Sequence, residues 1–302
     1  MAGTNQTTLV GKLQSIGDAI RAKTGKSETM TLAEMPDEIA GISGGGSFDW
    51  SQMQIPSSAE QKKFITTLES IDLTGIDTSS CTNFRYMFYN MNALTSIDLS
   101  PLDMSSATTV YGLFDTCRNL TSIDLSPLEG APITIATGMF SGCSRLESID
   151  LSPLEGAPIT TAASMFFGCG NLTSIDLSPL AGNVNIGLSS TLQNCTGLTS
   201  VSFAGFEETT VTATNHLFSG CSNLASIDLT ALDTSSVTTM NAMFINCTAL
   251  TTLKTGAGWT SSHITTAANK PKFPVAMQDE NGTQFASGDA IPDGAHTYTA
   301  VN

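Results

Sequence analysis

Hydrophobic and polar positions along this chain repeat with a period of 26 residues. The sub-motif L-x-S-I-D-L recurs, with substitutions in the later copies, at Leu68, Leu94, Leu120, Leu146, Leu172, Leu198, Leu224 and, as LTTLKT, Leu250. A fixed period of 20–50 residues is typical of a solenoid, in which each unit buries its apolar face only against its neighbours. The pattern therefore predicts an α/β solenoid over residues 68–255.

Two elements alternate within each predicted coil. In L-x-x-I-x-L the apolar residues face inward and the polar residues between them face outward, which indicates a short strand. In the second half of the repeat, Met240, Met243, Phe244 and Cys247 fall at i, i+3, i+4 and i+7. This spacing is typical of one face of a two-turn helix. We therefore expect a stack of 26-residue coils, each made of a short parallel strand and a short helix.

Two coils depart from the consensus. Thr191-Leu192 stands where most coils have Met-Phe, and Val201-Ser202-Phe203 lacks the usual aspartate. The period remains 26 residues through both coils. The stack is predicted to continue through them with a local change of surface.

The residues that flank the array predict separate units. Apolar residues at helical spacing predict an anchoring or oligomerising helical hairpin over residues 1–43, through Leu9, Leu13, Ile16, Ile20, Leu32, Met35 and Ile39. Such a hairpin is too small for a stable core. It should dock against another copy of itself or a larger assembly, or else fold back as a cap on the solenoid. The glycine-rich linker at 44–47 favours docking.

Residues 48–67 carry enough apolar mass to shield the first coil, as a terminal repeat requires. At the other end, residues 256–302 predict a small β cap. Its hairpin turn is expected at Asp279-Glu280-Asn281-Gly282, with Trp259 packed beneath the cap.

Charge excludes several classes of partner. The chain has 12 Lys+Arg against 27 Asp+Glu, for a net charge of −15. Nucleic acid needs basic clusters, which the sequence lacks, and the same argument disfavours an anionic membrane surface. No apolar run reaches the ~18 residues of a membrane span. The first residues show no basic or apolar signal region, so we expect no secretory signal.

Cysteines follow the repeat. Six of the seven, from Cys117 to Cys247, lie one period apart. Equivalent side chains on coils about 4.8 Å apart are too distant for the usual disulfide geometry. We predict a ladder of buried, reduced thiols that pack as small hydrophobes. Zinc-site spacing is absent, so no metal is expected.

Candidate chemistry is sparse. His216, His263 and His296 belong to no recognisable motif, and no nucleophile elbow, metalloprotease motif or phosphate loop occurs. We predict that the chain is not an enzyme and takes no cofactor. One electrostatic feature remains, a column of aspartates on the strand positions. Its members are Asp72, Asp98, Asp124, Asp150, Asp176 and Asp228.

The aspartate column has two interpretations. It forms either a negative strip that binds cations, basic loops or sugar hydroxyls, or a solubilising strip whose carboxylates accept hydrogen bonds from neighbouring serines and backbone. Neighbouring charges about 5 Å apart repel by about 0.8 kcal/mol in water. Under either interpretation the column must therefore be hydrated, or matched by cations or donors.

The repeat, most complete at residues 224–247, resembles the BspA-like (DUF285-type) leucine-rich repeats over about 68–255. That resemblance implies a leucine-rich-repeat-like stack, as in surface adhesins of bacteria and mycoplasmas and in phage-encoded proteins, without catalytic residues. Residues 16–25 and 30–36 are similar to a segment of tail and structural proteins of phages of Gram-positive bacteria. Residues 291–298 resemble C-terminal tails on some of those proteins.

These resemblances, together with the order of helical hairpin, flexible linker and repeat array, predict a non-enzymatic phage virion structural protein. Its N-terminal helices would bind other virion proteins or themselves, giving a homo-oligomer, and its solenoid would bind a host cell-surface protein or glycan. The chain would be made in the bacterial cytoplasm and reside in the virion. The alternatives are a purely architectural decoration protein and a bacterial cell-surface adhesin.

Overall fold

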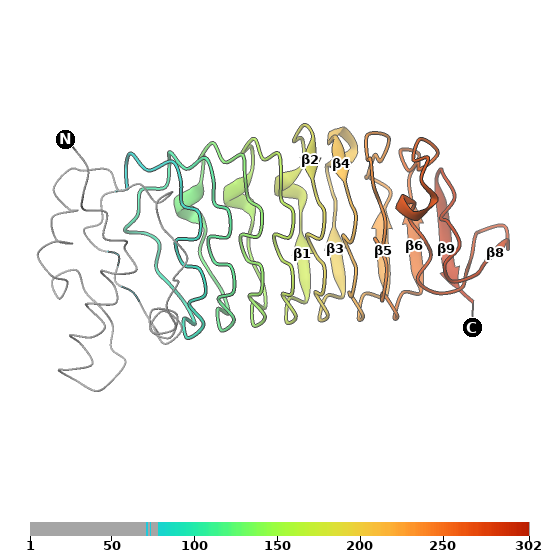
Figure 1. The fold of residues 1–302 in the computed structure, drawn as a ribbon, viewed down its shortest axis with the longest axis horizontal. Coiled ribbons are helices and arrows are strands. Elements are labelled where there is room, and N and C mark those ends of the chain that lie inside the picture. The colour runs from blue at the N-terminus through green and yellow to red at the C-terminus, as the bar shows by residue number, and fades with distance from the viewer. Residues whose placement is uncertain (1–70, 72, 74–77, 302) are drawn as a thin grey trace, which may run out of the picture.

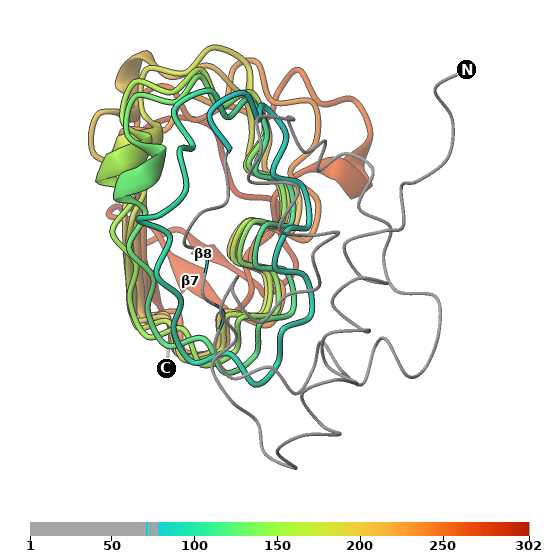
Figure 2. The same cartoon turned by 90° about the vertical axis from the view of Figure 1, so that its left-hand side faces the viewer.

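The computed structural model describes residues 71, 73 and 78–301. In this part the chain winds into coils that stack side by side along the long axis (Figure 1). Viewed along the stack, successive coils overlie one another around a shared interior (Figure 2). Backbone hydrogen bonds join residues 25–27 positions apart, so the predicted 26-residue solenoid is present. The predicted helical hairpin at 1–43, linker at 44–47 and cap at 48–67 lie outside the described residues.

Strands form in the later coils. β1 (Ser174–Asp176) pairs in parallel with β3 (Ser200–Ser202), and β5 (Ser226–Leu229) pairs in parallel with β6 (Thr252–Thr255). In the described coils before residue 174, the same motif forms no regular strand. One backbone bond, such as that from the Thr121 amide to the Thr95 carbonyl, joins each neighbouring pair there. The prediction of a strand in every coil was therefore too broad.

The strand half ends in a short 3₁₀-helix. In η4 (Ser126–Leu128), η5 (Ser152–Leu154) and η6 (Ser178–Leu180), a proline stands in the first turn and the final leucine is buried. Proline has no N–H to continue the ladder, and its fixed φ suits a helical start. Two further 3₁₀-helices are η7 (Phe206–Glu208) and η8 (Ala267–Asn269). Within the described residues, no helix is long and apolar enough to cross a bilayer.

The second half of each coil is a series of turns, so the prediction of a two-turn helix was wrong. The Met165 amide donates to the Ala162 carbonyl three residues back, at 3.1 Å. The intervening Ser164 amide instead donates to Ser189 on the next coil, at 2.9 Å. Alternate amides thus bond within the coil and between coils. An α-helix would direct all of them to residue i−4.

Backbone conformation explains why no helix forms. Ser164 and Gly168 have φ of 56° and 73°, in the left-handed region, and equivalent positions in other coils repeat these values. A positive φ at the third residue of a turn is the requirement of a type II turn. Two such turns four residues apart direct apolar side chains inward at i, i+3, i+4 and i+7. A helix gives the same spacing, which is why the pattern wrongly predicted a helix.

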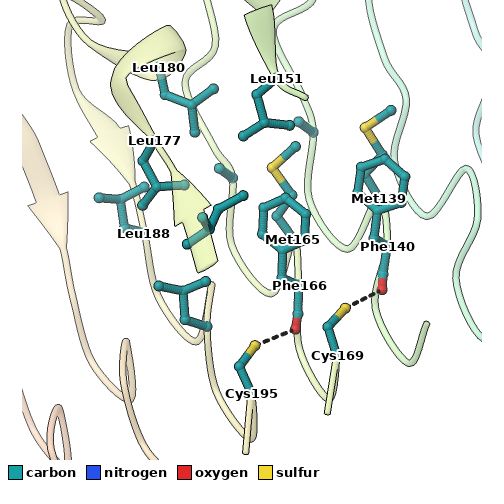
Figure 3. Packing of buried hydrophobic residues seen from close by; sticks show 14 of the residues in the cluster. Met139, Phe140, Leu151, Met165, Phe166, Cys169, Leu177, Leu180, Leu188 and Cys195 are labelled. Carbon is teal, nitrogen blue, oxygen red and sulfur yellow. Dashed lines mark hydrogen bonds between the residues drawn. The ribbon is translucent and has the colours of Figure 1, made fainter. Parts of the chain in front are cut away.

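Apolar side chains from both halves fill the interior. The rings of Phe88, Phe114, Phe140 and Phe166 stack coil upon coil, with centroids 5.3–5.7 Å apart. Each buried side chain of this size contributes roughly 1.5–3 kcal/mol. Figure 3 shows Phe140 and Phe166 with the methionines and leucines packed around them. Every coil therefore depends on its neighbours for its core.

The stack continues through the two departing coils, as predicted. Leu192 interrupts the column of phenylalanines, yet the Leu192 carbonyl still receives a bond from Cys221, and the Phe166 amide bonds to Thr191. An additional parallel pair forms here between β2 (Ile186–Gly187) and β4 (Val211–Ala213). The constant coil length of 26 residues keeps equivalent residues paired, even where the consensus residues are replaced.

The C-terminal end of the stack is closed by antiparallel strands. β9 (His296–Ala300) pairs with β6, and β7 (Met277–Gln278) lies between β9 and β8 (Gln284–Phe285). The predicted hairpin is thus confirmed, and Trp259 is buried as expected. Because β9 takes up the exposed edge of the last coil, no further coil can add there.

Candidate binding faces of the solenoid

Two long faces of the stack carry outward side chains. The strand face consists of residues 95–100 and their equivalents at multiples of 26. The turn face consists of residues 85–90 and their equivalents. Both faces run the length of the stack, so each is a candidate surface for a ligand. They differ in how far their residues repeat.

The strand face is nearly uniform. Serine occupies the second outward position in six successive coils, from Ser96 to Ser226. The aspartate column reads Asp98, Asp124, Asp150, Asp176, Ser202, Asp228 and Lys254, in parallel register where the strands pair. Asp72, the first predicted member, lies outside the described residues.

Each described aspartate of this column is used within its own coil. Its Oδ1 accepts a hydrogen bond from the backbone N–H two residues on, at 2.8–3.1 Å. The donors are Ser100, Ser126, Ser152, Ser178 and Thr230. This is an Asx-turn, which fixes the backbone as it leaves the strand. In three of these coils that turn leads into a Ser-Pro-Leu 3₁₀-helix.

These bonds favour the ionised carboxylates. The Ser100 side chain and backbone lower the pKa of Asp98, and the Ser152 backbone and side chain lower that of Asp150. Burial acts to raise the pKa of Asp176, but hydrogen bonds from Ser178 and Ser202 outweigh it and the pKa is lowered. The column is therefore negative at neutral pH.

The later coils relieve the resulting repulsion. Ser202 separates Asp176 from Asp228, and Lys254 lies 3.4 Å from the Asp228 carboxylate. These contacts agree with the interpretation of a solubilising strip whose carboxylates accept local hydrogen bonds. A ligand for the aspartate column stays a prediction.

The turn face changes from coil to coil. One outward column reads Arg85, Tyr111, Thr137, Ala163, Ser189, Asn215 and Asn241. A second column reads Tyr89, Asp115, Ser141, Phe167, Gln193, Ser219 and Ile245, of which Ser219 is buried. The coils are joined here by main-chain bonds, such as Gly112 N–H to Thr137 O at 2.9 Å. These main-chain bonds recur from coil to coil and do not depend on residue type, so most of these side chains can vary. A few also bond between coils, as Ser189 Oγ does to Asn215 Oδ1 at 2.6 Å.

A ladder of thiols supports the turn face from beneath. Each Sγ from Cys117 to Cys247 donates to the carbonyl of the residue 29 positions earlier, at 2.9–3.2 Å. Figure 3 shows this for Cys169 with Phe140 and for Cys195 with Phe166. The six cysteines of this ladder are buried and none of them forms a disulfide, in agreement with the predicted ladder of buried thiols. Burial raises the pKa of the Cys117 thiol to about 12.

An aromatic and cationic cluster stands at the N-terminal end of the described turn face, and sequence reasoning missed it. The Arg85 Cζ atom lies 4.3 Å from the Tyr111 ring centroid and 5.1 Å from that of Tyr86. Tyr86 meets Tyr89 and Tyr111 edge-on, with centroids 5.4 and 5.1 Å apart. A signal was present, because three of the four tyrosines of the chain lie within residues 86–111.

The histidines are not brought together. The His263 Nε2 atom lies 2.6 Å from the Val237 carbonyl oxygen, and His296 Nδ1 lies 3.0 Å from Glu280 Oε1 in the C-terminal cap. His216 has a left-handed backbone in a turn. Among the described residues, no three His, Cys, Asp or Glu side chains are grouped to hold a metal ion. The predicted anchoring residues Leu9–Ile39 lie outside the described part.

Comparison with known proteins bears on the repeat. The family model described as "Mycoplasma protein of unknown function, DUF285" matches residues 58–178 and 186–270, more than half of the chain. Among solved structures, a leucine-rich repeat protein from Bacteroides ovatus matches with 21% identity and a TM-score of 0.33. The match covers 68% of this chain and 55% of that one. No curated protein matches.

Proposed function

The chain belongs to the DUF285 family of repeat proteins, and from the geometry of its solenoid we propose that it is a non-catalytic binding protein. Its turn face would contact a protein or glycan on a cell surface. The solenoid supplies a rigid platform, because each coil is bonded to its neighbours along its turn half. Long regular surfaces of this kind suit the recognition of extended partners.

The contrast between the two faces carries the proposal. On the strand face the repeated aspartates are committed to local turns. On the turn face most side chains can differ from coil to coil, since the recurring bonds between coils are made by the main chain. A ligand is distinguished by side chains that differ along the surface, so specificity is expected on the turn face. The predicted role of the aspartate strip in binding is the competing possibility.

The particle or cell to which the chain is attached is a further part of the proposal. The resemblance of residues 16–25 and 30–36 to structural proteins of phages supports attachment to a virion through residues 1–43. The solenoid would then serve host adhesion. The bacterial surface adhesin and the purely architectural particle protein are the alternatives that experiment must separate.

The choice of face is tested with the full-length chain and intact cells of the producing bacterium and its relatives. A turn-face variant carries Phe167→Ser, Gln193→Arg and Ile245→Arg. The matched strand-face control carries Ser96→Arg, Ser122→Arg and Ser148→Arg, all at exposed positions. The turn-face variant should lose at least ten-fold in cell binding, with the control unchanged. The reverse result would transfer the function to the aspartate face.

The site of attachment is tested by mass spectrometry of purified virions and of the bacterial envelope. Stoichiometric peptides in virions support the phage assignment, whereas peptides confined to the envelope identify a bacterial adhesin. Virions that carry the turn-face variant provide the last distinction. Unchanged adsorption by such intact particles would indicate an architectural protein.

A further inference from the structure

The cluster formed by Arg85, Tyr86, Tyr89 and Tyr111, here called the tyrosine–arginine cluster, is fixed by the backbone beneath it. Gly112 has a φ of 58°, and a Cβ atom placed on it would lie 2.4 Å from Tyr86 Cε1. The Tyr86 ring therefore lies over a position that admits only glycine. The cluster is assembled across two coils and is held in a defined arrangement.

The Arg85 side chain is available to an anion. It is exposed, and no carboxylate in the part of the chain that the structure describes forms an ion pair with it. The guanidinium rests against Tyr111, which orients its planar fork of donors. A carboxylate is the ligand that such a fork binds with two parallel hydrogen bonds. The Asp115 carboxylate, one coil on from Tyr89, accepts a bond from the Thr116 hydroxyl at 2.8 Å.

Tyrosine rings add a surface for a partly apolar ligand. An aromatic face is negatively polarised, so it packs well against weakly positive C–H groups such as those on one side of a pyranose ring. Tyr86, Tyr89 and Tyr111 each keep part of their surface exposed. A ligand that combines C–H faces, hydroxyl groups and a carboxylate would satisfy every member of the cluster.

The extent of the cluster indicates a small ligand. Beyond Tyr111 the same outward column continues as Thr137, Ala163 and Ser189, without another aromatic or cationic side chain. A stable protein interface buries about 800 Å² on each partner, with large anchoring residues at its centre. Within the described coils the cluster extends over two, and this extent matches one sugar residue better than such an interface.

We propose that the tyrosine–arginine cluster binds a carboxylate-bearing sugar, such as a sialic or uronic acid, within a surface glycan. Arg85 would hold the carboxylate while the tyrosines pack against the ring. This inference rests on the proposed binding function and names its ligand class.

The test titrates the full-length chain with sialyllactose and with oligogalacturonate, and uses lactose as the neutral counterpart. At least one acidic probe should bind ten-fold or more tightly than lactose. Arg85→Gln should weaken that binding at least ten-fold, and Arg85→Lys by less. Tyr89→Ala should also weaken it. The control is Arg145→Gln, which removes another exposed arginine and should change nothing.

Two results would overturn the proposal: no preference for the acidic sugars, or equal binding by Arg85→Gln with unchanged circular dichroism. Cell binding separates this failure from that of the proposed function. If the wild-type chain binds cells and Arg85→Gln binds them equally, the sugar site is wrong and the binding function stands. If protease treatment of the cells, but not periodate, abolishes binding, the ligand is a protein. If the wild-type chain binds neither cells nor sugars, both proposals fail.

Discussion

The strand face and the turn face solve the same problem of stacking in different ways. On the strand face, side chains take part in the backbone geometry, as the Asp150 carboxylate does when it accepts the Ser152 N–H at 2.8 Å. On the turn face, main-chain bonds and buried thiols recur in the coils, whereas outward side chains bond between coils only at particular positions, such as Ser189 with Asn215. Repetition on one face thus reflects structural need, and variation on the other leaves room for recognition.

That contrast changes how a repeat sequence is interpreted. The aspartate column is the most conspicuous charged pattern in the chain, yet local hydrogen bonds account for its repetition. The tyrosine–arginine cluster occurs once, has no period and is hidden within a repeat. In a solenoid whose consensus positions are structural, departures from the consensus on the outer surface are the first place to look for a ligand.

The largest expected effect is that of alkaline pH on the thiol ladder. Burial raises the pKa of the cysteine thiols in the folded chain, for Cys117, Cys195 and Cys247 to about 12, from an ordinary value of 9.0. Their contribution to stability is fully present below about pH 9 and is lost as pH rises toward the folded pKa. Each thiol then costs about 1.4 kcal/mol per pH unit. Urea midpoints should fall steeply between pH 9 and 10.5.

A variant sharpens this prediction. Cys143→Ala with Cys169→Ala removes two ionising groups, so the pH dependence of the free energy of unfolding should become shallower. Stability at pH 7 should nevertheless decrease, because the Phe114 and Phe140 carbonyls each lose one of their two donors. A midpoint that is independent of pH up to 10.5 would contradict a buried ladder.

The next effect concerns the glycine beneath the tyrosine–arginine cluster. Gly112→Ala introduces both a strained left-handed residue and a clash with Tyr86, whereas Gly130→Ala introduces only the strain, since nothing lies within 4 Å there. The strain costs about 1–2 kcal/mol, and the clash adds about 1–3 kcal/mol. Denaturant unfolding should rank the variants in that order. Adding Tyr86→Ala to Gly112→Ala should recover much of the difference, and failure to recover it would argue against the clash.

A smaller effect is expected on the strand face. Asp176→Ala removes the acceptor for the Ser178 amide and hydroxyl, which should cost at most about 1 kcal/mol. Asp176→Asn keeps an acceptor oxygen and should cost less. Because the folded pKa of Asp176 is lowered, its stabilisation is present above the unfolded pKa and is lost as pH falls. Equal thermal stability of the Ala and wild-type chains at pH 7 would refute the structural role.

The smallest effect is that of the ion pair that ends the aspartate column. Lys254 and Asp228 are about half exposed, and exposed pairs contribute about 0–1 kcal/mol. Lys254→Ala should therefore lower the melting temperature slightly at low salt and not at all in 1 M NaCl. A large effect that persists at high salt would mean that Lys254 stabilises the stack by something other than an exposed ion pair.

The period of 26 residues was enough to predict a stack, because each coil can bury its apolar residues only against a neighbour. The same argument predicted the free thiols, since the coil spacing exceeds disulfide reach. The hairpin around residues 279–282 followed from local turn chemistry. In each case the determining interaction is local or is repeated at a fixed sequence distance. Sequence alone therefore settled these features.

Tertiary structure decided what the pattern left ambiguous. An i, i+3, i+4, i+7 pattern suits both a helix and two linked turns. Bonds from alternate amides to the next coil, together with left-handed residues such as Ser164, selected the turns. The use of the aspartates in local turns and the meeting of Arg85 with Tyr111 also appeared only in three dimensions. Those contacts depend on backbone direction and on neighbouring coils, and the order of residues does not specify either by itself.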